Sequence, residues 1–151
     1  MPVPVMKDTK QPLTPADLEA VEQRLGIRLP DDYRAWLLKH NGGRPKPAGF
    51  KYKLETGPYT DGVVAWFLGL HDGPHENFER DCRWWKGQHR LPENLFPIAD
   101  DPFGNLICMS FGGADKGKIY FWDHEEEGPE PSYDNCHLIA DSLQEFLEGL
   151  H

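Results

Sequence analysis

Long hydrophobic segments are absent from this 151-residue chain. The most apolar run, residues 63–70, is far shorter than the ~20 residues that a membrane-spanning helix needs. The N-terminus also lacks the apolar stretch of a secretion signal. We therefore expect neither a membrane protein nor a secreted one.

Cysteine is scarce as well, with only Cys82, Cys108 and Cys136 in the whole chain. None of them forms a Cys-x-x-Cys pair, which excludes the usual zinc and redox motifs. Free thiols fit a reducing compartment, so the sequence predicts a cytoplasmic location.

Basic residues are outnumbered: 16 Lys and Arg stand against 25 Asp and Glu, and the formal net charge is −9. Such a chain suits non-specific nucleic-acid binding poorly, because phosphate contacts need clustered Lys and Arg. The acidic surplus instead fits a basic protein partner, or simply a solvated surface. We expect no direct contact with nucleic acid or membrane.

Apolar and aromatic residues are sufficient for a folded core, at 38% and 12% of the chain, including five Trp. This composition excludes a disordered chain, and the length favours one domain. We predict an irregular, proline-rich arm over residues 1–12 and a single domain over residues 13–151.

Four helices are predicted from start and stop signals. Thr14 can cap a helix with its hydroxyl, Pro15 suits the first helical position, and Gly26 suits the end. Apolar residues at helical spacing predict further helices over residues 31–40 and 75–87. A last helix is predicted to follow a capping signal at Ser142.

Extended segments are predicted along the chain between these helices. We predict strands over residues 49–54, 63–70, 95–101, 105–111 and 118–124, with the very apolar run 63–70 as a central strand. A short glycine-rich link joins the last two strands and predicts an antiparallel hairpin. The predicted fold class is α+β, with a single, mainly antiparallel sheet and helices packed against it.

An acidic segment, residues 123–134, reads DHEEEGPEPSYD and contains no Lys or Arg. One interpretation is an electronegative edge that attracts a basic surface. The alternative is a solvated loop whose charges keep the neighbouring strand from pairing with other chains. The residues alone leave both open.

The spacing of the histidines and cysteines does not match that of a metal site or a catalytic site. His71 and His75 flank an aspartate without the spacing of a metal site, and His124 has no visible nucleophile beside it. Cys108 lies in an apolar strand, where packing is the simpler role. We predict no catalytic residue, no metal and no cofactor.

Two further patterns are ambiguous. The glycines of residues 104–117 lack the phosphate-loop motif G-x-x-x-x-G-K-[ST], so turns are expected. Trp84 and Trp85 lie among Arg80, Arg83 and Lys86, which suits either base stacking or a half-buried helix surface, the latter being favoured.

The order of motifs resembles the SUKH superfamily, which includes the yeast cell-wall assembly regulator and bacterial toxin-immunity proteins. The similar runs are LTPADLEAVEQRLGIRLPDDYRAWLLKHNGG, LFPIADDPFGNLICMSFGG, KIYFWDHE and IADSLQEFLEGL, within residues 13–150. Residues 44–94 match least. The resemblance implies an α+β fold with one curved sheet, and no catalytic centre.

The resemblance also implies a function. Bacterial members typically bind and neutralise a toxin domain, often a nuclease, whereas eukaryotic members act in signalling and scaffolding. We therefore predict an immunity protein that inhibits a cognate toxin domain non-covalently, as a monomer or weak dimer. A regulatory or scaffold module without a toxin partner is the alternative, and an enzyme is the weakest of the three hypotheses.

Acidic contacts follow from the expected partner, because a nuclease holds its polyanionic substrate in a basic cleft. The predicted contacts are seven carboxylates and one aromatic anchor: Glu125, Glu126, Glu127, Glu130, Asp134, Asp100, Asp101 and Tyr133. Trp122 is a second aromatic candidate, although packing within the sheet is the favoured alternative.

Overall fold

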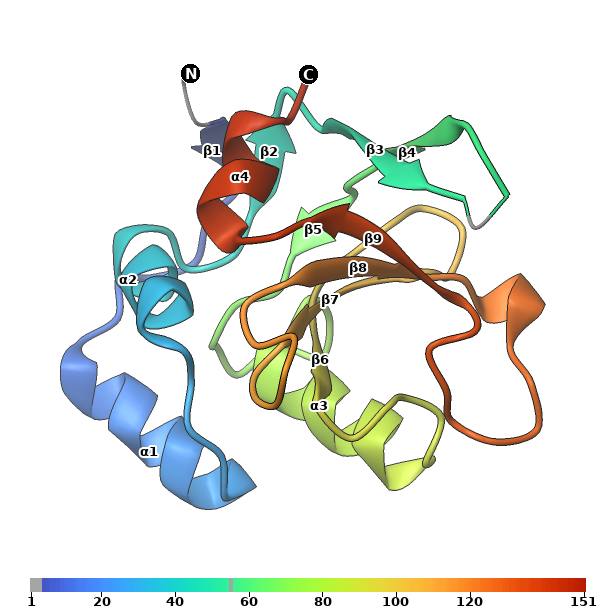
Figure 1. Cartoon of the computed structure of the whole chain (residues 1–151). Coiled ribbons are helices and arrows are strands. Elements are labelled where there is room, and N and C mark those ends of the chain that lie inside the picture. The colour runs from blue at the N-terminus through green and yellow to red at the C-terminus, as the bar shows by residue number, and fades with distance from the viewer. Residues whose placement is uncertain (1–3, 55) are drawn as a thin grey trace.

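The computed structural model of the chain describes residues 4–54 and 56–151 (Figure 1). The helices in these ranges are α1 (Pro15–Leu25), α2 (Asp31–Lys39), α3 (Phe78–Gly87), α4 (Leu143–Glu148) and the short 3-10 helix η1 (His124–Glu126). The strands are β1 (Val5–Lys7), β2 (Arg44–Lys46), β3 (Gly49–Lys53), β4 (Tyr59–Val63), β5 (Trp66–Phe67), β6 (Leu95–Asp100), β7 (Leu106–Ser110), β8 (Ile119–Trp122) and β9 (Cys136–Ala140). None of the described helices has the length and apolar character to cross a membrane.

The main sheet has the strand order β5-β6-β7-β8-β9, and every neighbouring pair is antiparallel. The predicted α+β class and the β7–β8 hairpin are therefore confirmed. The sequence predicted a single sheet, whereas the structure also contains two smaller two-stranded sheets, β1–β2 and β3–β4, because segments outside the main sheet pair with one another. In Figure 1 the β3–β4 hairpin lies to one side of the main sheet, above η1.

The prediction of a central strand over residues 63–70 is wrong. The run is divided, because Val63 ends β4 while only Trp66 and Phe67 form β5, at the edge of the main sheet. Between them the backbone changes partner: the Val64 N–H donates to Ala48 O (2.9 Å), and the Ala65 N–H donates to Asp100 O (2.8 Å). The apolar composition of this run indicated that it contacts the core, but it could not indicate which strand each part of the run pairs with.

Four strands lie wholly or mostly outside the predicted segments: β1, β2, β9 and β4, in which only Val63 belonged to a predicted strand. β1 lies within the segment expected to be an irregular arm, and it pairs with β2. Residues 1–3 of that arm lie outside the described residues. β9 pairs with β8 although its sequence, CHLIA, has no clear alternation. β1, β2 and β9 depend on partners that are distant in the sequence or joined through a long loop.

Helix ends follow the capping signals. Thr14 and Asp17 cap α1 reciprocally, with Thr14 N–H to Asp17 Oδ2 at 2.8 Å and Asp17 N–H to Thr14 Oγ1 at 3.3 Å. Gly26 ends that helix in the left-handed region at φ 67°. α3 begins later than predicted, at Phe78, because the Asn77 side chain accepts the Arg80 N–H (3.0 Å).

Apolar side chains form two clusters, one on each face of the main sheet. The larger cluster joins Ile107 and Phe121 of the sheet to buried residues of all four α-helices. The smaller cluster contains Leu95, Cys108 and Trp122, with Trp85 packed against it. Successive residues of β8 thus point to opposite faces, as predicted from their alternation.

Candidate functional site

The acidic segment forms a loop whose two ends are hydrogen-bonded to each other. It leaves β8 at Asp123 and returns to β9 through Asn135, at the right of Figure 1. The Asp123 N–H donates to Asn135 O (3.0 Å), and Asn135 Nδ2 donates to Asp123 O (3.0 Å). The Asp123 carboxylate also accepts the Glu125 N–H (2.9 Å), which starts η1. The loop is therefore anchored at its base.

Glu127, one of the predicted contacts, is held by an internal ion pair. Arg90 Nε and Nη2 donate to its two carboxylate oxygens at 2.9 and 2.8 Å. The same guanidinium lies over the rings of Trp85 (4.7 Å) and Trp122 (5.5 Å). Hydrogen bonding to Arg90 holds the pKa of Glu127 below its usual value. Glu127 therefore fixes the loop against the smaller core cluster.

Glu126 is also engaged, because its Oε1 lies 2.7 Å from Nε2 of His137, whose side chain is 9% exposed. With Asp123, these two residues form the group of described residues whose donor atoms could hold a metal ion, all within 4.8 Å of one another. Burial, Glu126 and Glu125 raise the pKa of Asp123. The Glu126–His137 contact joins η1 to β9 without requiring an ion.

The far end of the loop packs back on the sheet through Tyr133. Its hydroxyl donates to Asp115 Oδ2 (2.8 Å), and its ring meets the ring of Tyr120 edge-on at 5.4 Å. The Tyr133 side chain is 39% exposed, so part of it still faces solvent. Glu130 and Asp134, the remaining carboxylates of this part of the loop, are exposed.

The two earlier aspartates have different environments. Asp100 is half-buried at the end of β6, where it accepts the Trp66 N–H (3.2 Å) and burial raises its pKa to about 7. Asp101 Oδ1 accepts the N–H groups of Phe103 (2.9 Å) and Asn105 (2.8 Å), and so organises the β6–β7 turn. Trp122 is fully buried, as the packing alternative predicted.

Asp101 and the start of the acidic segment meet at a surface cavity of about 460 Å³, which we call the acidic hollow. Its walls come from the β3–β4 hairpin, the β6–β7 turn and the end of β8. It is lined by Tyr52, Asp61, Gly62, Val63, Asp101, Phe103, Asn105, Phe121, Asp123 and Glu125. Four of these lining residues are acidic and none is Lys or Arg, so the lining is acidic.

Aromatic rings complete the acidic hollow. Tyr52 stacks on Phe121 with ring centroids 4.4 Å apart, and the Phe103 side chain is 71% exposed at its edge. Burial raises the pKa of Tyr52, and the charges of Asp123, Glu126 and Asp101 raise it further. At Gly62 a Cβ atom would lie 2.5 Å from the Phe50 ring, so glycine lets the hairpin approach the core here.

Sequence reasoning missed Tyr52, Asp61 and Phe103. The first two lie in the region that resembles the family least, and nothing local places them beside the acidic segment. Phe103 did carry a signal, since it stands between Pro102 and Gly104 in a turn, where a large apolar side chain has little core to enter. Exposed aromatic residues of this kind are frequent anchors of protein interfaces.

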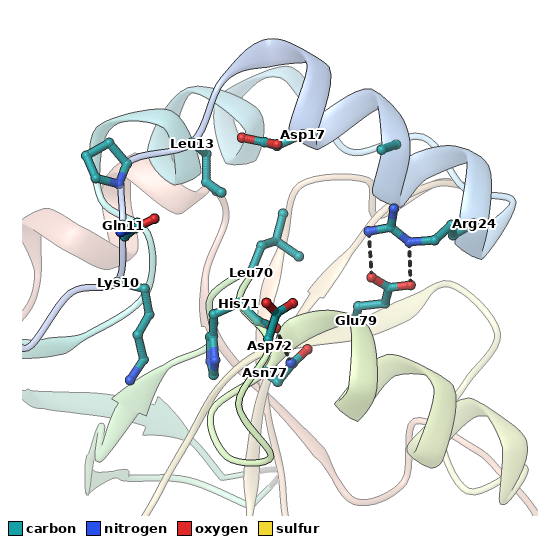
Figure 2. A pocket seen from close by; sticks show the side chains of 12 residues that line it. Lys10, Gln11, Leu13, Asp17, Arg24, Leu70, His71, Asp72, Asn77 and Glu79 are labelled. Atoms are coloured by element: carbon teal, nitrogen blue, oxygen red, sulfur yellow. Dashed lines mark hydrogen bonds and ion pairs between the residues drawn. The ribbon is translucent and has the colours of Figure 1, made fainter.

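A second cavity, of about 520 Å³, lies between α1, residues 10–13 and the loop that precedes α3 (Figure 2). Figure 2 shows Arg24 of α1 directed at Glu79 of α3, with contacts of 2.9 and 2.8 Å. Asn77 Nδ2 donates to His71 O (2.7 Å) and Gly73 O (3.0 Å). These polar groups bind one another, so the acidic hollow is the better candidate for partner binding.

The other candidate residues have structural contacts. His71 uses both ring nitrogens, with Nε2 at 3.0 Å from Glu76 O and Nδ1 accepting the Gly73 N–H (3.0 Å). His124 Nε2 lies 2.9 Å from Phe103 O and supports that turn. The three cysteines are free thiols, and burial raises the pKa of each, that of Cys136 to about 12. Such thiols are poor nucleophiles.

Comparison with known proteins shows similarity over nearly the whole chain. The profile of the SMI1 / KNR4 family (SUKH-1) matches residues 12–149. The SPbeta prophage-derived uncharacterized protein YokK of Bacillus subtilis (strain 168) is 31% identical over 151 residues, which cover 91% of this chain and 74% of YokK. The uncharacterized protein YnaB of the same organism is 46% identical over 33 residues, 22% of this chain and 23% of YnaB.

Proposed function

We propose that this chain, which belongs to the SMI1 / KNR4 family (SUKH-1), is a cytoplasmic immunity protein that binds a toxin domain and blocks it without covalent chemistry. The proposed partner is a basic domain, most simply a nuclease. The observation that carries the proposal is the acidic hollow, a cavity lined by four acidic residues and an exposed phenylalanine.

Charge complementarity supports this partner class. A nuclease cleft is basic because it binds phosphates, so an acidic surface can occupy the position of the nucleic acid. Opposite charges also accelerate the encounter of two proteins, and rapid capture matters for an inhibitor. Phe103 supplies the apolar anchor that charge alone does not provide.

Internal pairing divides the proposed contacts into two groups. Glu126 and Glu127 shape the loop through His137 and Arg90, and Asp101 shapes the β6–β7 turn. Glu125, Glu130, Asp134 and Tyr133 remain the proposed direct contacts of the acidic segment. Asp100, which is half-buried and accepts the Trp66 N–H, is the weakest of the proposed contacts.

A capture and neutralisation experiment tests the proposal. The tagged chain is incubated with lysate of its host, and bound proteins are identified after washing at low and high salt. We expect a basic toxin domain that the chain retains at low salt and whose activity an equimolar amount of the chain abolishes. Phe103→Ala is expected to weaken inhibition by about tenfold, within the range for an interface anchor.

The matched control is Leu38→Ala, which removes another exposed large apolar side chain, on α2. It should leave inhibition unchanged. A captured partner whose activity the chain does not alter would contradict the immunity role and favour the regulatory or scaffold alternative.

A further inference from the structure

We infer that Asp123, Glu126 and His137 form a binding site for a divalent transition-metal ion, and that Zn²⁺ is the ion their donor atoms fit best. The inference goes beyond the proposed function and does not rest on it. The three residues come from the two ends of the acidic segment, and we call them the His137 cluster. One donor atom of each residue lies within 4.8 Å of the other two.

The His137 cluster follows from the backbone at the end of β8. Asp123 caps η1, and the Glu126 N–H donates to Asp123 O (3.2 Å), so the two residues stand three apart in a 3-10 turn. Side chains at this spacing lie on the same side of a 3-10 helix. His137 of β9 pairs with Phe121 of β8, and alternation along the extended backbone turns Asp123 to the same face. The turn and the strand pairing together make the three side chains converge.

His137 provides the observation that points to a ligand. Its side chain is 9% exposed, and it is the one buried histidine among the seven of the chain. Its Nε2 atom is directed into the cluster, 2.7 Å from Glu126 Oε1, and within residues 4–54 and 56–151 the ring has no hydrogen-bond partner outside the cluster. A buried polar ring is costly unless its nitrogens are bonded, and imidazole is the commonest metal ligand in proteins.

Two carboxylates bring negative charge to this buried ring. Neither Asp123 nor Glu126 forms an ion pair with Lys or Arg in the part of the chain that the structure describes. Asp123 Oδ1 accepts the Glu125 N–H (2.9 Å), which leaves Oδ2 for an ion. Burial and the charges of Glu126 and Glu125 raise the pKa of Asp123. A divalent cation between the carboxylates would remove their repulsion, because it becomes the largest local charge.

The donor set selects the class of ion. One imidazole nitrogen and two carboxylate oxygens suit zinc, whereas Mg²⁺ and Ca²⁺ prefer oxygen ligands alone. The donors of a tetrahedral zinc lie about 2.1 Å from the ion, and therefore about 3.4 Å from one another. Rotation about the side-chain bonds of Glu126, which is 53% exposed, can bring the donor atoms to this separation. Three protein ligands leave the fourth position for water.

Titration of the full chain with Zn²⁺, after treatment with a chelator, tests the inference. Calorimetry measures the stoichiometry and the Kd, and NMR spectra of the histidine rings show which nitrogen binds. We expect one equivalent of Zn²⁺ to bind and to shift the Nε2 signal of His137. Hydrogen exchange over residues 123–137 should slow, because the ion joins η1 to β9. Mg²⁺ should bind at least about tenfold more weakly, since it demands octahedral coordination by oxygen.

Variants localise the site. Glu126→Gln and Asp123→Asn each remove one charged ligand and should raise the Kd for Zn²⁺ by at least about tenfold, the loss seen even for supporting contacts of a metal site. Glu126 is exposed, and asparagine can still cap η1 at position 123, so both variants should fold. The matched controls are Glu125→Gln, the same change of charge next to the cluster, and His75→Gln at an exposed histidine. Both should leave the Kd unaltered.

The inference is overturned if Zn²⁺ binds without saturation, if the ring signal of His137 does not move, or if Glu125→Gln weakens binding as much as Glu126→Gln. Equal affinity for Mg²⁺ would also overturn it, since the carboxylates alone would then account for binding. None of these measurements requires a toxin domain, so failure of the metal site and failure of the proposed function are separate results.

Discussion

At the scale of single residues, the carboxylates of this chain differ sharply in what surrounds them. Glu127 is paired with Arg90, whereas Asp100 is half-buried and accepts the backbone N–H of Trp66. Burial, together with the charges of Asp81 and Glu76, raises the pKa of Asp100 to about 7. This side chain therefore makes the stability of the protein depend on pH.

Asp100→Asn should stabilise the protein at alkaline pH. Between about pH 4 and pH 7 the folded chain retains a proton that the unfolded chain has released, so the free energy of unfolding falls as pH rises through this window. Asparagine removes the charge and still accepts the Trp66 N–H. We expect a gain of about 1 kcal/mol at pH 8, reduced for solvent access, and almost none at pH 4.

Urea denaturation of both proteins at the two pH values measures this difference. Asp31→Asn is the control, since that carboxylate is 92% exposed. An equal effect of Asp100→Asn at both pH values would show that Asp100 does not carry the predicted proton.

At the scale of secondary-structure elements, the acidic segment is shaped by what it packs on rather than by regular structure of its own. Arg90, just beyond α3, connects three parts of the fold: the carboxylate of Glu127, the ring of Trp85 on α3 and the ring of Trp122 on β8. Tyr133 fixes the other half of the loop to Asp115. The loop thus covers the smaller core cluster and presents its remaining carboxylates to solvent.

Arg90→Ala should loosen the acidic segment and destabilise the protein. The change leaves Glu127, with a side chain only 21% exposed, without its partner and removes the packing over Trp122. We expect a loss of about 2 kcal/mol, typical of a partly buried charge-assisted bond, and faster hydrogen exchange over residues 127–135.

Arg28→Ala is the matched control, because Arg28 is 84% exposed and its contact with Asp31 measures 3.9 Å. Its effect should stay within about 0.5 kcal/mol. If Arg90→Ala behaved like Arg28→Ala, the loop would not depend on the Arg90–Glu127 pair.

At the scale of the whole molecule, the buried apolar core and the acidic surface lie in different parts of the fold. The main sheet is buried on both faces, and the acidic hollow lies where the sheet meets the β3–β4 hairpin. The net charge of −9 gives the molecule a long-range attraction for basic proteins. We expect the acidic hollow to be the surface that such a partner contacts.

Reversing exposed charges should alter the rate of association with the captured toxin domain rather than the stability. The double variant Glu125→Lys, Glu130→Lys changes side chains outside the internal ion pairs and should slow association by about tenfold at low salt. The difference should shrink at high salt, because exposed charges are screened beyond about 10 Å at 0.1 M. Stopped-flow or surface-binding kinetics at several salt concentrations measure it.

The control is Glu19→Lys, Glu145→Lys, which makes the same change of net charge on α1 and α4, away from η1 (Figure 1). Equal slowing by both double variants would assign the effect to net charge alone. Unchanged association at low salt in the first variant would remove the acidic segment from the interface.

The sequence by itself determined the features that depend on near neighbours along the chain. The cap at Thr14, the stop at Gly26 and the β7–β8 hairpin each need only contacts within a few residues, which residue type and spacing report directly. The two-sided burial of β8 follows from simple alternation. The family resemblance likewise follows from the order of these local motifs.

Only the tertiary structure decided which strands are neighbours and which carboxylates remain for a partner. The run 63–70 is divided because its hydrogen bonds go to two different strands, and Glu127 is neutralised by Arg90, 37 residues away. Residues of the β3–β4 hairpin and of η1 line one hollow because the hairpin lies beside the end of β8. Apolar pattern and charge report whether a side chain is buried or solvated, whereas the identity of its neighbour depends on how distant segments pack.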